Sequence, residues 1–188
     1  MSKNLEEMSL EELWQLFPIF LVEHNKDWKS WYEEEKIIIT ALIPKEYIMR
    51  IAHIGSTAIS NIWAKNIVDI LIELNLETQL EEVKNILTNN GWLCMSEDLN
   101  RISLNKGYTK QGFADRVFHL HLRIKGDNDE LYFRDYLREN EDIAKEYERL
   151  KLSLWRRFEH NRDGYTDAKT DFIKKYSKIA KESYGVRY

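Results

Sequence analysis

The fold is decided by the stretch His53-Ile54-Gly55-Ser56-Thr57 and the run that follows it, Asn66-Ile67-Val68-Asp69-Ile70-Leu71-Ile72-Glu73-Leu74. The second run is rich in β-branched residues and predicts the strongest strand of the protein. Tyr47 to Ile54 predicts a strand before it, and Gly55-Ser56-Thr57 predicts a turn into a short helical segment that reaches about Trp63. The sequence therefore indicates a strand–turn–helix–strand unit at the centre of the fold.

Helical spacing dominates the chain before this unit. Ser9-Leu10-Glu11-Glu12 matches a capping box and predicts a short helix that Pro18 ends. A longer helix is expected from about Asp27 to a stop at Pro44. Its apolar face is expected to contain Trp28, Trp31, Tyr32, Ile38, Ile39 and Leu42.

Strands and helices also follow the unit. Thr78-Gln79-Leu80-Glu81 predicts the start of a helix and Asn90-Gly91 its end. Three further strands are expected near Trp92–Met95, Arg101–Gly107 and Val117–Ile124. Three helices are expected to finish the chain, over Glu130–Arg138, Glu141–Glu159 and Asp167–Tyr184.

This order of elements predicts a single domain over residues 1–188, with residues 1–26 as an N-terminal helical extension. The expected fold class is α/β, or α+β. In it a mixed β-sheet is flanked by helices and carries helical additions at its N-terminal and C-terminal ends. A chain of 188 residues is long enough to bury one substantial core.

The composition limits the classes of function. A net charge of −4 with 32% charged residues argues against bulk nucleic-acid binding, which depends on basic surface. The longest apolar run is short and interrupted by Asp69, so no membrane span is expected. The start of the chain turns acidic where a signal peptide would be apolar. Cys94 is the only cysteine and is expected in the core, which favours a cytoplasmic location.

Two candidate sites lie in the central unit. Backbone N–H groups of a Gly55-Ser56 turn at a helix start would bind phosphate well, and the alternative is an ordinary helix cap with Ser56 at the N-cap. Asp69 interrupts the apolar strand, where an acid is costly unless it is paired, hydrated or metal-bound. Asp69, Leu71 and Glu73 share one face of that strand.

Two further candidates lie later in the chain. His119 and His121 point to the same side of a strand, a geometry suited to a metal ion or phosphate, or to a plain polar face. Arg134 and Arg138 are i, i+4 neighbours on a helix and could together hold a phosphate, or belong to an exposed face.

At these residues the chain resembles the GrpB family. The resemblance rests on His53-Ile54-Gly55-Ser56-Thr57-Ala58-Ile59, on Ala64-Lys65 with Val68-Asp69-Ile70-Leu71, and on His119-Leu120-His121. It continues through Phe133-Arg134-Asp135-Tyr136-Leu137-Arg138 to Tyr147, Lys151, Tyr165 and Lys169, and covers roughly residues 28–181.

The resemblance implies a fold like that of polymerase-β-type nucleotidyltransferases, in which a Gly-Ser turn holds nucleotide phosphates and strand acids hold Mg²⁺ or Mn²⁺. Asp69 and His121 are the implied catalytic residues. The implied metal ligands are Asp69, Glu73, His119 and His121. The implied phosphate-binding residues are His53, Gly55, Ser56, Thr57, Lys65, Arg134, Arg138, Lys151 and Lys169.

This sequence departs from that superfamily in its acids. The second acid usually stands two residues after the first, where this chain has Leu71. Glu73, His121 or Asp135 would have to complete the metal set. Pro and Gly residues usual in the family are also replaced, by Ser60, Asn61 and Asn66.

Three functions follow as hypotheses. The first is a metal-dependent nucleotidyltransferase that transfers a nucleoside monophosphate to an unknown acceptor. The second is a non-catalytic module that binds a nucleotide or a coenzyme-like small molecule, in keeping with the fusion of GrpB-type domains to dephospho-CoA kinase. The third is an interaction protein that forms a homodimer through the aromatic residues Trp14, Phe17, Phe20, Trp28 and Trp31.

Overall fold

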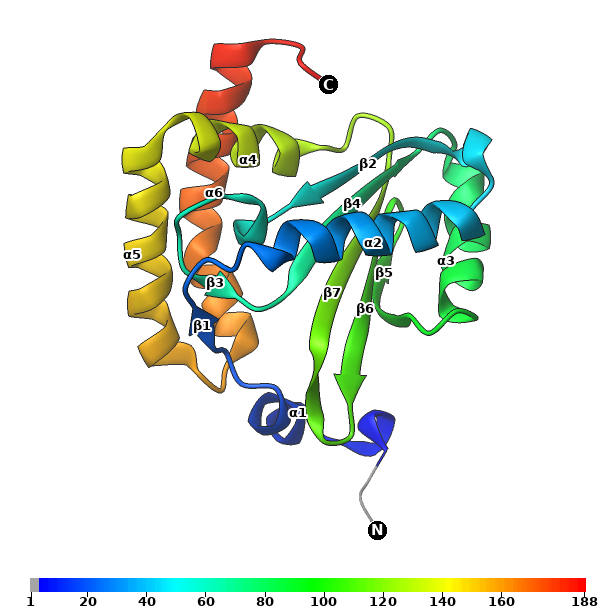
Figure 1. Ribbon diagram of the computed structural model, residues 1–188, viewed down its shortest axis with the longest axis horizontal. Helices are drawn as coiled ribbons and strands as arrows, with labels where there is room; N and C mark the ends of the chain where they lie inside the picture. Colours follow the sequence, from blue (N-terminus) through cyan, green and yellow to red (C-terminus); the bar gives the residue numbers. More distant parts are fainter. Residues whose placement is uncertain (1–3) are drawn as a thin grey trace.

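A five-stranded mixed sheet forms the centre of the protein (Figure 1). The computed structural model describes residues 4–188. The strand order is β2-β4-β7-β6-β5, with β4 and β7 parallel and the other neighbours antiparallel. The strands are β2 (Ile48–Ile54), β4 (Val68–Leu74), β5 (Leu93–Asp98), β6 (Arg101–Thr109) and β7 (Gly112–Ile124).

One face of the sheet is covered by α2 (Asp27–Leu42) and α3 (Leu80–Thr88). Alternation along β4 sends Val68, Ile70 and Ile72 to this side, where all three are fully buried. Trp28 of α2 is also fully buried in this core. Its indole N–H donates to Asn66 Oδ1 over 2.7 Å, which ties the helix to the segment entering β4.

Three helices pack together on the other side of β2, at the left of Figure 1. They are α4 (Asp129–Glu139), α5 (Glu141–Phe158) and α6 (Arg162–Tyr184). Leu131 of α4 packs on Ile54 and Leu71, while Phe133 and Tyr147 join α4 to α5. None of the helices in the described part of the chain combines the length and the apolar composition needed to cross a membrane.

The N-terminal segment contains less helix than expected. It consists of a 3-10 turn (Leu5–Glu7), α1 (Leu10–Leu16) and a short strand β1 (Leu21–Val22). The Ser9 capping box of α1 is confirmed. β1 pairs with β3 (Ala64–Lys65), and strands this short leave no periodic signal in a sequence. Other 3-10 turns are Lys45–Tyr47, Ser56–Ala58 and Glu77–Gln79.

The mixed sheet flanked by helices is confirmed, but three local expectations are wrong. The segment after Gly55 forms only one 3-10 turn, because the backbone leaves it at Ile59 in an extended conformation. Ile38 is 48% exposed, since the buried face of α2 runs through Glu35, which pairs with Lys106 over 2.6 Å. Cys94 is exposed because β5 is an uncovered edge strand.

Candidate functional site

The polar centre of the molecule lies where β4 and β7 run side by side. Their parallel register places Asp69 beside His119 and Leu71 beside His121. These side chains point away from the face covered by α2. Asp69 Oδ1 lies 3.5 Å from His119 Nδ1 and 3.4 Å from His121 Nε2, so both imidazoles meet one carboxylate oxygen.

The Gly55-Ser56 turn closes over this carboxylate. Gly55 has φ +70°, and a Cβ added there would lie 2.4 Å from Asp69 Oδ2. Only glycine therefore lets the turn approach Asp69 this closely. The Ser56 side chain lies near the hydroxyl of Tyr147, which belongs to α5. The turn and Asp69 thus form one unit.

Three lysines converge on the same centre from β3, α5 and α6. Lys65 and Lys169 both lie over the Tyr165 ring, with Nζ 5.9 and 4.3 Å from its centroid. Lys151 is 2% exposed, lies over the Tyr147 ring and donates to the carbonyl of Trp63. None of the three lysines forms a salt bridge with a side chain that the structure describes.

Burial shapes the ionisation of this centre. Burial, reinforced by the charge of Lys169, lowers the pKa of Lys65 and of Lys151 to about 7. Burial lowers the pKa of Lys169 to about 8, against the opposing charge of Asp69. Burial would raise the pKa of Asp69, but the hydrogen bonds and charge of His119 and His121 outweigh it and lower that pKa.

A chain of polar contacts leads from Asp69 to α6. Burial lowers the pKa of His119 to about 4, so its ring is neutral at pH 7. Its Nε2 lies 2.8 Å from the Tyr108 hydroxyl, which accepts a 2.9 Å hydrogen bond from Arg162. Tyr108 and Arg162 were not expected here from the sequence, since neither belongs to a recognisable motif. Only the fold brings them to the histidines.

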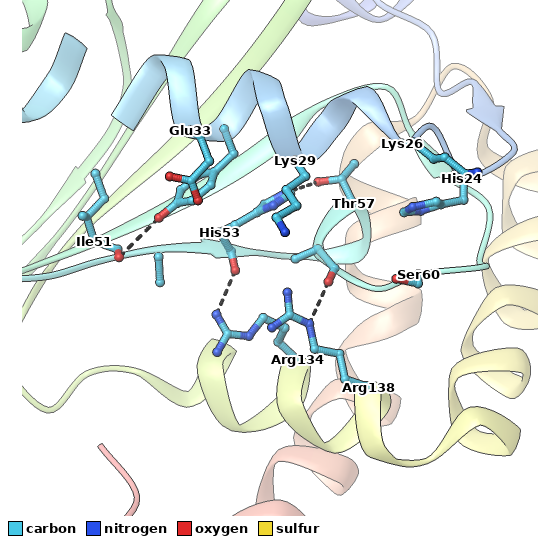
Figure 2. Close-up of a pocket in the computed structure, with 13 residues that line it drawn as sticks. His24, Lys26, Lys29, Glu33, Ile51, His53, Thr57, Ser60, Arg134 and Arg138 are labelled. Carbon is cyan, nitrogen blue, oxygen red and sulfur yellow. Dashed lines mark hydrogen bonds between the residues drawn. The ribbon is translucent and has the colours of Figure 1, made fainter. Parts of the chain in front are cut away.

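Four of the expected phosphate-binding residues line a different pocket, of about 620 Å³, between α2 and α4 (Figure 2). In β2, His53 pairs with Ile70 and so faces α2, whereas the next residue pairs with Asp69 on the opposite face. His53 Nε2 lies 2.9 Å from Thr57 Oγ1. Arg134 and Arg138 enter this pocket from α4.

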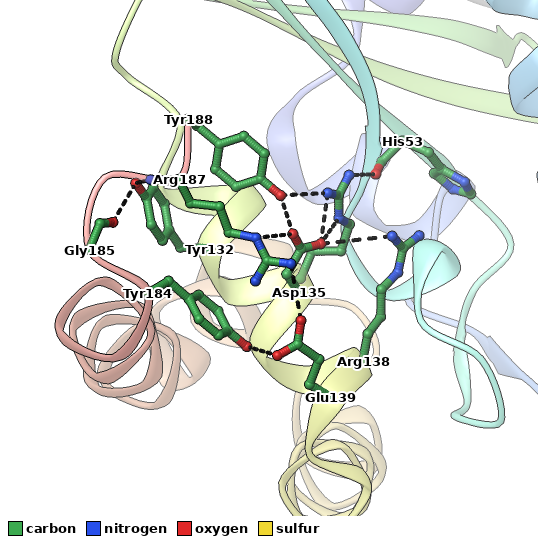
Figure 3. A network of polar contacts seen from close by, with 10 residues as sticks. His53, Tyr132, Asp135, Arg138, Glu139, Tyr184, Gly185, Arg187 and Tyr188 are labelled. Carbon is green, nitrogen blue, oxygen red and sulfur yellow. Dashed lines mark hydrogen bonds and ion pairs between the residues drawn. The ribbon is translucent and has the colours of Figure 1, made fainter.

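Arg134 is engaged by the protein itself, whereas Arg138, 43% exposed, is engaged only in part (Figure 3). Arg134 donates to the carbonyl of His53 over 2.9 Å, to Asp135 over 2.7 Å and to the Tyr188 hydroxyl over 3.2 Å. Arg138 donates to the carbonyl of Ala58 over 2.8 Å. Asp135 is buried in this network and does not reach Asp69, so we interpret the network as structural support for the turn.

Glu73 lies apart from the polar centre. Its side chain is fully buried and forms an ion pair with Arg50. It also accepts hydrogen bonds from the Gly126 N–H over 2.9 Å and from Asn128 over 3.0 Å. The Glu73 carboxylate is therefore engaged by these partners, at the end of β4 away from Asp69.

These donors do not fit a magnesium site. Mg²⁺ needs near-octahedral oxygen ligands, and Asp69 is the single carboxylate at the centre, with lysines around it. Leu71 packs on Leu131, and Glu73 is held by Arg50. In the part of the chain that the structure describes, no group of three His, Cys, Asp or Glu side chains is arranged to hold a metal. The binding of Mg²⁺ or Mn²⁺ that the resemblance implies stays a prediction.

The lowered lysine pKa values predict an unusual pH dependence of stability. Between about pH 7 and 9.5 the unfolded chain binds more protons at Lys65, Lys151 and Lys169 than the folded protein does. The free energy of unfolding should therefore rise with pH, by up to roughly 1.4 kcal/mol per pH unit for each lysine. Urea denaturation at pH 7, 8 and 9 measures this slope. Lys151→Met should reduce it, and an unchanged slope in this variant would contradict the prediction.

Known proteins resemble this chain over most of its length. The family model described as GrpB protein matches residues 18–178. UPF0157 protein YqkA of Bacillus subtilis is 32% identical over 178 residues, which are 92% of this chain and 51% of that protein. The chain thus spans about half the length of that relative.

A second relative and a solved structure agree with this match. Glutamate-rich protein GrpB of Alkalihalophilus pseudofirmus is 32% identical over 165 residues, 82% of this chain and 91% of that protein. The crystal structure of conserved protein GrpB from Enterococcus faecalis has a TM-score of 0.76 and 30% identity, over 88% of this chain and 99% of that one. Sequence and fold lead to one conclusion: the chain belongs to the GrpB family.

Proposed function

We propose that this protein binds the phosphate groups of a nucleotide or a coenzyme-like small molecule at the Asp69 centre. The observation that carries the proposal is the convergence of Lys65, Lys151 and Lys169, none of which forms a salt bridge with a side chain that the structure describes. After burial, the charge of Lys169 is the largest cause that lowers the pKa of Lys65 and of Lys151. A cluster of like charges in a half-buried site is stabilised by an anion.

The surroundings suit a phosphate more than a simple halide. The Gly55-Ser56 turn, which lies against Asp69, would offer backbone N–H groups to the ligand, and such turns bind phosphate oxygens well. Charge-assisted hydrogen bonds from several lysines would match the several oxygens of a di- or triphosphate. An acid beside the lysines, Asp69, would orient a hydroxyl group of the ligand.

Replacing Lys169 with methionine tests the proposal. The variant should weaken binding of ATP or pyrophosphate, measured by calorimetry without divalent metal, by about 10- to 100-fold, since one charge-assisted hydrogen bond is lost. Lys178→Met is the matched control on the same helix, because the Lys178 side chain is 79% exposed and should not affect binding. Equal affinities of both variants and the wild type would reject the lysine site.

Nucleotidyl transfer is the second candidate. It is favoured by the contact between the Gly55-Ser56 turn and Asp69, the arrangement that the resemblance associates with this reaction. Asp69 or His121, 3.4 Å apart, would take the proton of the acceptor hydroxyl. Pyrophosphate release from nucleoside triphosphates with Mg²⁺ or Mn²⁺, lost in Asp69→Asn, would support it. Tight binding of the nucleoside triphosphate without pyrophosphate release would favour the non-catalytic binding module.

A further inference from the structure

A large apolar groove adjoins the polar centre. Its volume is about 1000 Å³, and it lies between the N-terminal segment with α1 and the edge strand β5. The apolar side chains along it are Leu5, Leu10, Leu13, Trp14, Phe17, Trp92, Leu93 and Met95. Tyr108, Arg162 and Asp163 also line the groove. The lining is thus mainly apolar and includes one arginine and the aspartate that follows it in the chain.

Arg162 has unused binding capacity among the lining residues. Its Nε is buried and has no hydrogen-bond partner, while another of its N–H groups donates to the Tyr108 hydroxyl over 2.9 Å. Among the side chains that the structure describes, no carboxylate forms an ion pair with Arg162, although Asp163 also lines the groove. A buried guanidinium N–H without an acceptor is costly, and a ligand oxygen would satisfy it.

The groove and the polar centre are continuous through Arg162. The Tyr108 hydroxyl that accepts from Arg162 also meets His119, which contacts Asp69. Arg162 lies close enough to Lys65 for its charge to lower the pKa of that lysine. An anionic group beside Arg162 would therefore lie next to the Tyr108–His119–Asp69 contacts of the polar centre.

We propose that the ligand is an amphiphilic anion, whose phosphate head is held by Arg162 beside the polar centre and whose apolar chain lies in the groove between α1 and β5. The binding of the phosphate head rests on the function proposed above, whereas the binding of an apolar chain in the groove goes beyond it. Leu10, Leu93 and Met95 are 59%, 41% and 51% exposed, so a chain placed on them removes apolar surface from water.

A series of alkyl phosphates tests this inference. Methyl, butyl, hexyl and octyl phosphate, each below its micelle concentration, are titrated by calorimetry at pH 7. Affinity should rise about two- to fourfold for each added methylene. Octanol should bind far more weakly than octyl phosphate. Arg162→Met should weaken every member of the series by a similar factor.

Two methionines provide matched variants. Met95 lies at the irregularity of the edge strand β5, and Met49, 44% exposed, lies at the irregularity of the other edge strand, β2. Met95→Asp should abolish the gain with chain length and leave methyl phosphate binding unchanged. Met49→Asp should retain both the gain in affinity with chain length and the binding of methyl phosphate.

The outcomes separate the two proposals. If methyl phosphate binds and the affinity does not rise with chain length, the apolar chain does not occupy the groove, and the phosphate site alone is retained. Octanol that binds as tightly as octyl phosphate overturns the role of Arg162. Loss of all phosphate binding overturns the function proposed above. A dimer in sedimentation that dissociates in Met95→Asp, without any chain-length effect, would show that a second copy covers the groove instead.

Discussion

Gly55→Ala is expected to abolish phosphate binding and to lower the free energy of unfolding by roughly 2–5 kcal/mol. Two effects combine at this position. The backbone has φ +70°, which a residue with a Cβ adopts at a cost, and the Cβ would lie 2.4 Å from Asp69 Oδ2. Because Asp69 is held by His119 and His121, it cannot yield without displacing the centre.

Gly91→Ala is the control for this prediction. Gly91 has φ +89° and open space around its added Cβ, so the variant carries the backbone cost alone, about 1–2 kcal/mol. Urea denaturation and titration with pyrophosphate compare the two variants. The excess cost of Gly55→Ala should shrink when Asp69→Ala removes the carboxylate. If both glycine variants lose the same free energy of unfolding and Gly55→Ala still binds pyrophosphate, the close contact with Asp69 is not needed for binding.

Local sequence patterns predict those parts of the site that depend on a single strand. The β-branched run around Asp69 predicted β4, and alternation predicted that His119 and His121 share a face. Their contact with Asp69, however, depends on the parallel pairing of β4 with β7, which is a non-local feature. Periodicity reports the direction of a side chain along one strand and leaves its neighbour on the next strand open.

The placements that the sequence does not predict have the same origin. The motif groups His53 with Gly55, whereas strand alternation turns His53 to the α2 side. Arg134 was expected to meet the ligand phosphates, and its fork is instead engaged by Asp135 and the carbonyl of His53. Arg162 follows the break between two helices, where no pattern marks it, and only packing brings it beside Tyr108.

The assignment of Glu73 to the protein interior leads to the second large prediction. Arg50→Met should lower the free energy of unfolding by about 3–5 kcal/mol, because it leaves a buried carboxylate without its charged partner. Glu73 is 0% exposed, and its remaining donors, Gly126 N–H and Asn128, are neutral. The loss also removes the stacking of Arg50 on the Tyr188 ring, 4.9 Å from its centroid.

A double variant separates these contributions. Arg50→Met with Glu73→Gln should recover most of the loss, since the amide oxygen can still accept from Gly126 and no charge stays buried. The exposed pair Arg101–Asp127 is the control: its arginine is 56% exposed, so Arg101→Met should cost at most about 1 kcal/mol. Equal costs for Arg50→Met and Arg101→Met in urea denaturation would mean that water reaches Glu73. A Glu73 so hydrated would again be free to act as a ligand, whereas the expected large difference confines its role to holding β4 against β2.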